Sequence, residues 1–306
     1  MKKILSVTIG IPAHNEEKNI GYLLDSILKQ KKGNYVLQST IVACDGCTDK
    51  TAKIVKKYQN KYKLIKLIDD TRRLGKSERI NKLYIMNKSD ILVTIDSDVV
   101  FANRSSLQEI INCFNSQKIG LVGGHDIPYP PRNLFEKIAT VADQLWYETR
   151  KDFNNGSNVQ NYHACISAIR REVSQKIHIP PELIADDGYI YFRTFKLGYK
   201  FRFAKNALVY YRAPNNLEDY LKQTSRFLSL KSLVAKHFGQ RVYQYYRIPL
   251  IFKIKALLKI SKREPWYLIL AIFLQIFIRI AQFKQLENKP NGLWPIIQSS
   301  KSIFFK

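Results

Sequence analysis

The sequence predicts an α/β fold in which a mainly parallel, twisted sheet is flanked by helices. Short runs rich in β-branched residues alternate with amphipathic segments of helical spacing up to residue 122. Strands that alternate with helices are joined by right-handed crossovers, which makes neighbouring strands parallel. The composition agrees, because 45% hydrophobic and 25% charged residues are typical of a chain with a packed core.

The expected elements follow in chain order. The first strand covers Leu5 to Ile11 and ends at Pro12. Asn15 then offers an N-cap for the next helix, and Glu16 and Glu17 fall in its first turn, where the helix dipole favours carboxylates. The later strands are expected at residues 40–44, 64–68, 91–95 and 119–122, and the helices at residues 20–28, 51–58, 77–87 and 107–114.

Further along the chain the regular alternation fades. Residues 125–165 are rich in aromatic residues and are expected to be loop-like. A helical stretch follows Asp186-Asp187, and Gly198 is expected to cap its carboxyl end. The last expected elements are strands over residues 199–211 and a helix over residues 220–238.

The balance of charge predicts an anionic partner. The chain carries 50 Lys and Arg against 25 Asp and Glu, a formal net charge of +25. Such an excess favours nucleic acid, an anionic membrane surface or phosphorylated substrates as partners. From residue 196 onward about 21 basic residues stand against about 4 acidic ones, so the excess is strongest in the last third.

The last third also contains two apolar segments. Pro249 to Ile260 interleaves apolar residues with lysines, which is typical of a helix that lies on a membrane surface. Pro265 to Ile278, at about 14 residues, is short of the roughly 20 that span a bilayer. We expect association with the cytoplasmic face of a membrane, either peripheral or through one carboxyl-terminal segment. A buried core helix is the alternative for the second segment.

The cysteines and histidines exclude several classes of protein. Four cysteines are too few and too scattered for a disulfide scaffold, so a reducing, cytosolic compartment is expected. Cys44 and Cys47 have no second pair at zinc spacing, and the five histidines show no such spacing either. Polar residues interrupt the apolar stretch after Lys3, so no signal peptide is expected.

Two carboxylates, Asp96 and Asp98, follow directly after the expected strand at residues 91–95. Their mutual repulsion must be offset, and a divalent cation is the usual means. Ligands that are all oxygen favour Mg²⁺ or Mn²⁺, which commonly carry substrate phosphates as further ligands. Asp45 also falls at the carboxyl end of a strand, where ligands of such sheets bind. A solvated pair of aspartates in a turn is the alternative.

Six short motifs occur in order along the chain, and each is weak alone. They are Pro12-Ala13-His14-Asn15-Glu16-Glu17, Cys44-Asp45-Gly46-Cys47-Thr48-Asp49, Gly75-Lys76 with Asn81, Asp96-Ser97-Asp98, Asp186-Asp187 and Gln223-Thr224-Ser225-Arg226-Phe227. Together, from about Leu5 to Phe227, they resemble the motifs of family-2 glycosyltransferases, which have the GT-A fold of the nucleotide-diphospho-sugar transferase superfamily. The sequence departs from the family pattern at His14, where Tyr is usual, and at Phe227, where Trp is usual.

The resemblance implies a donor site for a UDP- or GDP-sugar. The residues that it assigns to donor binding are Pro12, Ala13, Glu16, Asp45, Lys76, Asp96, Asp98 and Arg226. By resemblance, Asp45 hydrogen-bonds the base, Asp96 lies near the ribose or donor sugar, and Asp98 ligates Mg²⁺ or Mn²⁺ with Asp96 as the second candidate ligand. Lys76 and Arg226 are expected to contact phosphate. Cys44 and Cys47 replace the usual Asp and Ser, which leaves the base open.

The resemblance also implies inverting transfer by a single displacement. Asp187 is the expected base that deprotonates the acceptor hydroxyl, with Asp186 as the alternative, and either of them could instead cap the following helix. Gln223 and Phe227 are the expected acceptor contacts, although a core position is equally open for Phe227.

We therefore expect a metal-dependent glycosyltransferase that adds a single sugar to a hydroxyl acceptor, possibly lipid-linked. The GT-A catalytic domain is expected over residues 1–238, with a nucleotide-sugar half at 1–105 and an acceptor half at 106–238. A membrane-associating helical region is expected over residues 239–306.

Two alternative functions remain. A sugar nucleotidyltransferase would carry a Gly-rich amino-terminal loop, which this chain lacks. A non-enzymatic basic protein that binds nucleic acid or membrane would not need ordered carboxylates, which repel phosphate unless a metal intervenes. No nucleic acid partner is expected.

Overall fold

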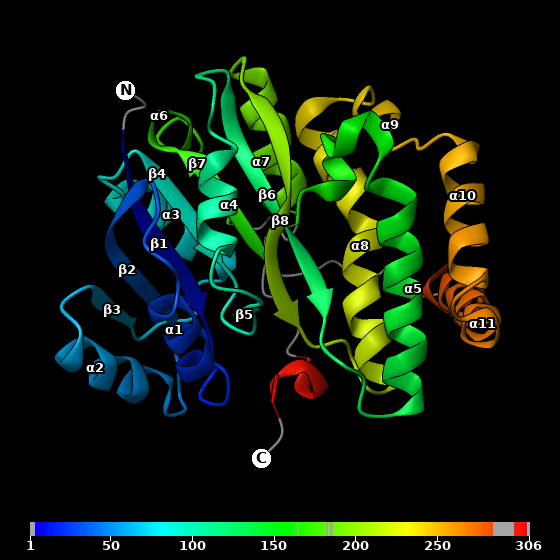
Figure 1. The fold of residues 1–306 in the computed structure, drawn as a ribbon, viewed down its shortest axis with the longest axis horizontal. Helices are drawn as coiled ribbons and strands as arrows, with labels where there is room; N and C mark the ends of the chain where they lie inside the picture. The colour runs from blue at the N-terminus through cyan, green and yellow to red at the C-terminus, as the bar shows by residue number, and fades with distance from the viewer. Residues whose placement is uncertain (1–3, 164, 182, 184–185, 284–296, 305–306) are drawn as a thin grey trace.

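The computed structural model describes residues 4–163, 165–181, 183, 186–283 and 297–304. A single mixed sheet of order β3-β2-β1-β4-β7-β6-β8-β5 forms its centre, with helices on both faces (Figure 1). The strands are β1 (Leu5–Ala13), β2 (Tyr35–Asp45), β3 (Ile65–Asp70), β4 (Ile91–Ile95), β5 (Val100–Phe101), β6 (Ile119–Pro128), β7 (Ile166–Arg170) and β8 (Lys200–Tyr211). The α/β class predicted from the alternation is confirmed.

The expectation of a mainly parallel sheet holds for the first half of the chain and needs correction for the second. Strand β1 pairs in parallel with β2 and β4, and β2 with β3. Strand β7 runs antiparallel to both of its neighbours, β4 and β6, and β5 runs antiparallel to β8. Local periodicity does not report the direction of a strand, so the antiparallel insertion of β7 could not be read from the alternation.

The two faces of the sheet bury alternate residues of the same strand. In β4, Ile91, Val93 and Ile95 join the core beneath helices α1 (Ile20–Leu28), α2 (Thr51–Lys61) and α4 (Ser106–Asn112). Leu92 joins the opposite core, beneath α3 (Lys76–Met86) and α7 (Asp186–Lys196). All five residues of β4 are buried, as expected for a central strand covered on both faces.

Helix α1 covers residues 20–28 as expected, but its N-cap is not the residue that the sequence predicted. Asn15 does not cap it, because its φ of 53° is left-handed and its side-chain Oδ1 accepts a hydrogen bond from Thr48 N at 2.8 Å. The N-cap position is Asn19, after a turn in which Glu16 O accepts from Asn19 N at 2.9 Å. The prediction for Asn15 was therefore wrong, because a contact with the distant 45–49 turn outweighed the local capping signal.

The segment expected to be loop-like contains a long helix, α5 (Leu134–Arg150). Asn133 caps it by accepting from Glu136 N at 2.8 Å. Glu136 is fully buried and pairs with Arg212 Nη1 at 2.9 Å. The prediction missed α5 because its aromatic residues mask the helical period, and because its start depends on a partner far along the chain.

The remaining helices complete the second half. They are α6 (Arg171–Ser174), α8 (Leu217–Phe238), α9 (Val242–Tyr245), α10 (Leu250–Ser261) and α11 (Pro265–Phe283), with the 3-10 turns η1 (Phe153–Gly156), η2 (Val159–Asn161) and η3 (Gln298–Ser300). The predicted cap at Gly198 is confirmed by its φ of 83° directly after α7. Figure 1 shows α10 and α11 outside α5, on the side away from the sheet.

Helix α11 is part core and part surface. Leu268 and Ala271 are buried in a cluster with Val141 of α5 and Ile260 of α10. Within the described ranges, no helix combines the length and the apolar character that a membrane span requires. The expected membrane segment is therefore not supported as a span.

Candidate active site

The carboxyl ends of β1, β2 and β4 meet at one edge of the sheet. Ala13, the last residue of β1, is in register with Cys44, next to Asp45 at the end of β2. Asp96 follows β4 directly, and its N–H donates to Cys165 O at 3.0 Å. Pro12 and Ala13 are buried at this edge. Three of the sequence motifs thus converge on one edge, as expected for parallel strands.

Asp45 is held entirely by protein donors. It is 4% exposed, and its two carboxylate oxygens accept from Leu74 N at 2.7 Å and Gly75 N at 2.9 Å. Arg79 Nε lies 3.1 Å from the same carboxylate. Gly75 has a φ of 96°, which favours glycine at this turn. Asp45 therefore anchors the loop that ends at Lys76.

Lys76 joins two acidic segments. Its Nζ lies 2.7 Å from Asp96 Oδ1 and 4.0 Å from Asp186 Oδ2. Burial lowers the pKa of Lys76, but the charges of Asp96, Asp186 and Asp187 outweigh burial and hold that pKa above its usual range. Burial, reinforced by Asp96, raises the pKa of Asp186, and Lys76 opposes that rise. The ammonium is thus the positive centre between the Asp96 turn and the start of α7.

Helix α3 also orients the chain that leads to Asp186. Asn81, which is 4% exposed, donates from Nδ2 to Ile179 O at 2.7 Å and accepts at Oδ1 from Ile179 N at 2.9 Å. Ser77 Oγ donates to Leu183 O at 2.9 Å. The lysine and asparagine of one sequence motif therefore contribute in different ways, Lys76 by charge and Asn81 by holding the preceding loop.

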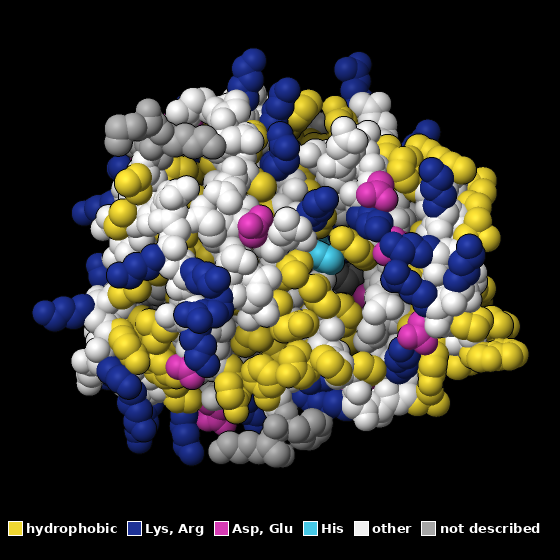
Figure 2. All heavy atoms as spheres, in the orientation of Figure 1, with side chains coloured by type: hydrophobic (Ala, Val, Ile, Leu, Met, Phe, Trp, Pro, Cys, Tyr) yellow, Lys and Arg dark blue, Asp and Glu magenta, His cyan; other side chains and the backbone are white. Residues whose placement is uncertain are grey.

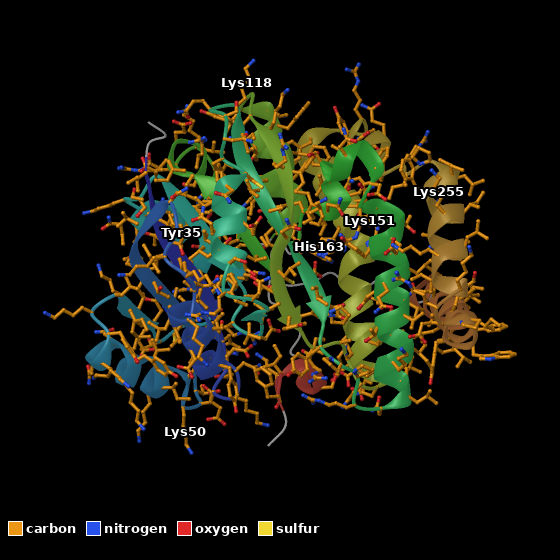
Figure 3. All side chains as sticks on the ribbon, in the orientation of Figure 1. Tyr35, Lys50, Lys118, Lys151, His163 and Lys255 are labelled. Carbon is orange, nitrogen blue, oxygen red and sulfur yellow. The ribbon has the colours of Figure 1, made fainter. Side chains whose placement is uncertain are left out.

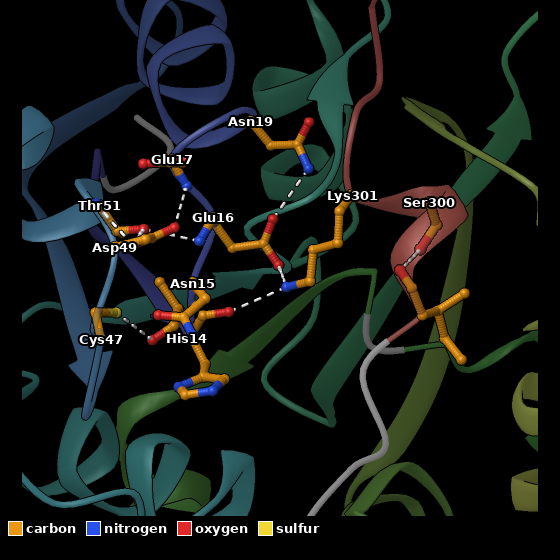
Figure 4. A network of polar contacts seen from close by, with 12 residues as sticks. His14, Asn15, Glu16, Glu17, Asn19, Cys47, Asp49, Thr51, Ser300 and Lys301 are labelled. Atoms are coloured by element: carbon orange, nitrogen blue, oxygen red, sulfur yellow. Dashed lines mark hydrogen bonds and ion pairs between the residues drawn. The ribbon is translucent and has the colours of Figure 1, made fainter.

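A lysine from the far end of the chain completes the site. Lys301 forms an ion pair with Glu16 and donates to His14 O at 3.0 Å (Figure 4). Burial and the charge of Asp98 raise the pKa of Glu16 to about 7, against the opposing effect of Lys301. Burial and Asp96 likewise raise the pKa of Asp98, and Lys301 opposes this rise too. Sequence reasoning missed Lys301, because no motif distinguishes it from the other basic residues of the last third.

The structure describes only some of the side chains of the motif Gln223-Thr224-Ser225-Arg226-Phe227 on α8. Gln223 lies half-buried on α8, which packs against α7 through Val234 and Ile190. The side chains of Arg226 and Phe227 lie outside the described residues, so their expected contacts with phosphate and acceptor stay predictions.

A wide hollow at the opposite edge of the sheet has no comparable chemistry. Asp90 and Arg170 line it. Asp90 accepts from Ser6 N at 2.9 Å and Ser6 Oγ at 2.7 Å, whereas Arg170 donates to Ile119 O at 2.8 Å. These groups hold the fold together, so we place the candidate site at the carboxyl edge.

The sequence profile of glycosyl transferase family 2 matches residues 8–178, more than half of the chain. The chain belongs to glycosyl transferase family 2. The matched region contains Glu16, Asp45, Lys76, Asp96 and Asp98. The predicted resemblance is therefore confirmed at the level of the family.

Two known proteins show how much of this family-2 chain is similar in sequence to its relatives. The chain is 25% identical over 266 residues to the "Probable glycosyltransferase YdaM" of Bacillus subtilis, which covers 82% of this chain and 61% of that protein. It is 34% identical over 114 residues to the 4,4'-diaponeurosporenoate glycosyltransferase of Staphylococcus aureus. This match covers 37% of this chain and 29% of that protein. The chain thus spans less than two thirds of the length of these relatives.

Solved structures share the fold of this family-2 chain. The mannosyltransferase PcManGT from Pyrobaculum calidifontis has a TM-score of 0.60 at 19% identity, covering 93% of this chain and 79% of that chain. Glucosyl-3-phosphoglycerate synthase from Mycobacterium tuberculosis has a TM-score of 0.54 at 16% identity, and the match covers 77% of this chain and 79% of that chain. These similarities support the GT-A-like architecture.

The residues of this family-2 site could supply some of the ligands of a divalent cation, with substrate phosphates as its remaining ligands. Among the described residues, no three His, Cys, Asp or Glu side chains cluster as a metal site. Asp96 and Asp98 form a carboxylate pair in which burial and the charge of Asp96 raise the pKa of Asp98. A divalent cation would relieve that repulsion, and Mg²⁺ usually takes its remaining ligands from water and substrate phosphates.

Proposed function

We propose that this family-2 glycosyltransferase moves one sugar from a UDP- or GDP-sugar to a hydroxyl acceptor, with inversion at the anomeric carbon. The observation that carries the proposal is the row of alternating charges formed by Asp96, Lys76 and Asp186, with Asp98 beside Asp96. The row lies at the carboxyl edge of the sheet, where α/β proteins bind nucleotides.

Asp98 and Asp96 are the proposed ligands of Mg²⁺ or Mn²⁺. When bound, the cation would neutralise charge that develops on the leaving nucleoside diphosphate. PcManGT was solved with GDP-Man and Mn²⁺, and the Mycobacterium tuberculosis synthase with Mn²⁺ and UDP, which supports the same donor class here. Lys76 and Arg226 are proposed to contact phosphate, with Pro12, Ala13 and Glu16 lining the donor pocket.

For Asp45 we propose a different role from the base contact expected from the resemblance. Its oxygens already accept from Leu74 N and Gly75 N, and Arg79 neutralises its charge. A base would have to reach the lone pairs that remain on a carboxylate that is only 4% exposed. Asp45 therefore acts as a positioning residue for the loop before Lys76.

Asp187 is the proposed base that deprotonates the acceptor hydroxyl. Asp186 is 1% exposed and lies near Lys76, whereas Asp187 is half-buried and can be reached by an acceptor. The proton would pass from the hydroxyl to the carboxylate as the oxygen attacks the anomeric carbon. Gln223 and Phe227 remain the proposed acceptor contacts.

The outer face of α10 and α11 is the proposed docking surface for an anionic membrane. Its large exposed side chains include Leu250, Ile254, Leu258, Trp266, Phe273 and Phe277. Figure 2 shows hydrophobic spheres along this side together with basic ones, and Lys255 projects from α10 in Figure 3. Apolar contact combined with lysines suits the surface of an anionic bilayer. Peripheral docking at the cytoplasmic face would bring the enzyme close to a lipid-linked acceptor.

A donor screen tests the proposal. The protein is incubated with UDP- and GDP-sugars and either Mn²⁺ or Mg²⁺, and release of the nucleoside diphosphate is measured. One donor should be hydrolysed slowly without acceptor, and chelation should stop the reaction. A sugar nucleotidyltransferase would instead release pyrophosphate from a nucleoside triphosphate and a sugar phosphate, and that result would replace the proposal.

A further inference from the structure

Residues 297–304, which we term the C-terminal strap, lie across the edge of the sheet that carries the candidate site. Two buried contacts hold Ile303, since Arg212 Nη2 donates to Ile303 O at 2.5 Å and Ile303 N donates to Asn19 Oδ1 at 2.9 Å. Ser299 N donates to Asp219 Oδ2 at 2.8 Å. Ile303 is fully buried. The strap is thus docked by specific contacts.

The end of the strap adds aromatic contacts. The ring of Phe304 lies 4.9 Å from that of Tyr22 and 5.1 Å from that of Tyr129, both edge-on. Tyr22 belongs to α1 and Tyr129 follows β6, so the strap bridges the two halves of the sheet. Figure 1 shows this segment below the ends of the central strands.

These contacts direct Lys301 into the acidic pocket. Its ammonium pairs with Glu16, which is 5% exposed, and its side chain retains 19% exposure. Lys301 is therefore a cation that pairs with a buried carboxylate beside the end of β1.

A nucleoside diphosphate brings further negative charge to Glu16, Asp96 and Asp98. One divalent cation does not balance that total, and Lys76 is already paired with Asp96. A lysine has a flexible four-carbon stem and three donors, so its ammonium can exchange a carboxylate for a nearby phosphate oxygen with little movement of the backbone. The ammonium would then offset part of the negative charge that the diphosphate brings to the site.

We infer that Lys301 is a donor-binding residue whose ammonium passes from Glu16 to the diphosphate, so that the C-terminal strap closes one side of the donor site. This inference rests on the proposed function. It extends the site beyond residues 8–178, the region matched by the family profile. It also gives part of the carboxyl-terminal region a role in donor binding in addition to membrane docking.

Calorimetry on the full chain tests the inference with UDP and GDP in the presence of Mn²⁺. Lys301→Met keeps the apolar stem and should weaken nucleoside diphosphate binding by about 10-fold or more, the effect of losing a hydrogen bond to a charged group. Lys301→Arg should stay within about 3-fold of wild type. Lys118→Met is the matched control, because Lys118 is exposed at the far end of the molecule (Figure 3).

Equal nucleoside diphosphate binding by Lys301→Met would overturn the inference, because Lys301 would then not contact the diphosphate. Tighter binding would also overturn it, because it would mean that the strap blocks the site. Wild-type protein that binds neither nucleotide would instead contradict the proposed function itself. Lysine acylation of the wild-type protein, read by mass spectrometry, gives a second measurement that needs no variant to fold. UDP or GDP with Mn²⁺ should protect Lys301 and leave Lys118 unchanged, and unchanged or increased labelling of Lys301 would refute donor contact.

Discussion

The ammonium of Lys76, at the first residue of α3, lies 2.7 Å from Oδ1 of Asp96, which follows β4. This contact links the loop anchored by Asp45 to the carboxylate pair of Asp96 and Asp98. Because Asp186, the neighbour of the proposed base Asp187, lies 4.0 Å from the same ammonium, the donor side and the acceptor side share one cation. Changes of the metal ligands should alter donor hydrolysis, whereas changes of the base should alter only transfer to the acceptor.

Asp98→Ala should lower kcat by about 10³-fold, because it removes a proposed ligand of the cation that stabilises the leaving group. The loss should appear in donor hydrolysis as well as in transfer, and the dependence on Mn²⁺ concentration should change. Asp69→Ala, at an exposed position of β3, is the matched control. Full activity of the Asp98 variant would rule out the metal assignment.

Asp187→Asn should lower the rate of transfer by about 10²–10⁴-fold, the usual contribution of a general base. The affinity for the nucleoside diphosphate should stay within about 3-fold, since the proposed role concerns the acceptor. Single-turnover transfer and calorimetry separate these two effects. Transfer at the wild-type rate would move the base elsewhere, with Asp186 as the next candidate.

Asn81→Ala should lower the free energy of unfolding by about 2–3 kcal/mol. It removes two buried hydrogen bonds and leaves Ile179 N and Ile179 O without their partner. Urea denaturation measures the loss, and Asn115→Ala at an exposed position should be nearly neutral. A similarly small effect of both changes would mean that Asn81 does not hold the loop before Asp186.

Glu16 should make stability fall as the pH rises from about 4.5 to about 7. Burial raises its pKa from 4.5 to about 7, so the folded protein binds the proton more tightly than the unfolded chain does over this range. The stabilisation is complete below the unfolded pKa and is lost as the pH passes the folded pKa, about 3 kcal/mol in total. Urea midpoints across this range should show a shallower pH slope for Glu16→Gln. Parallel slopes would contradict the raised pKa.

Phe273→Glu combined with Ile254→Glu should abolish binding to anionic vesicles in a flotation assay. The two residues are 66% and 43% exposed on the outer face of α10 and α11, and a carboxylate there opposes both apolar contact and lipid charge. Donor hydrolysis in solution should be unchanged. Ile85→Glu, at a position that is 79% exposed on α3, is the control. Retained vesicle binding by the double variant would exclude this face as the docking surface.

Some features of the protein follow from local sequence alone. The run Ile91–Ile95 predicted its strand to the residue, because five consecutive apolar or β-branched residues suit a strand buried on both faces. Motif order predicted the family, and the placement of Asp45 and Asp96 after strands predicted that they would meet at one edge. Each of these inferences depends on periodicity or on chain order, which the sequence states directly.

Other features depend on contacts between distant parts of the chain. The antiparallel direction of β7, the start of α5 beside Arg212 and the left-handed Asn15 all arise from partners that no local pattern specifies. The contact of Asp45 with the base stays a prediction from resemblance, and only the tertiary structure shows that Leu74 N and Gly75 N donate to its oxygens. Lys301 is one basic residue among 50 in the sequence, and only docking of the strap brings its charge to Glu16. The sequence by itself thus determined the strands other than β5 and β7, the family and the edge that carries the carboxylates. Tertiary structure decided which charges meet there, because electrostatic pairing depends on distance in space and not on separation along the chain.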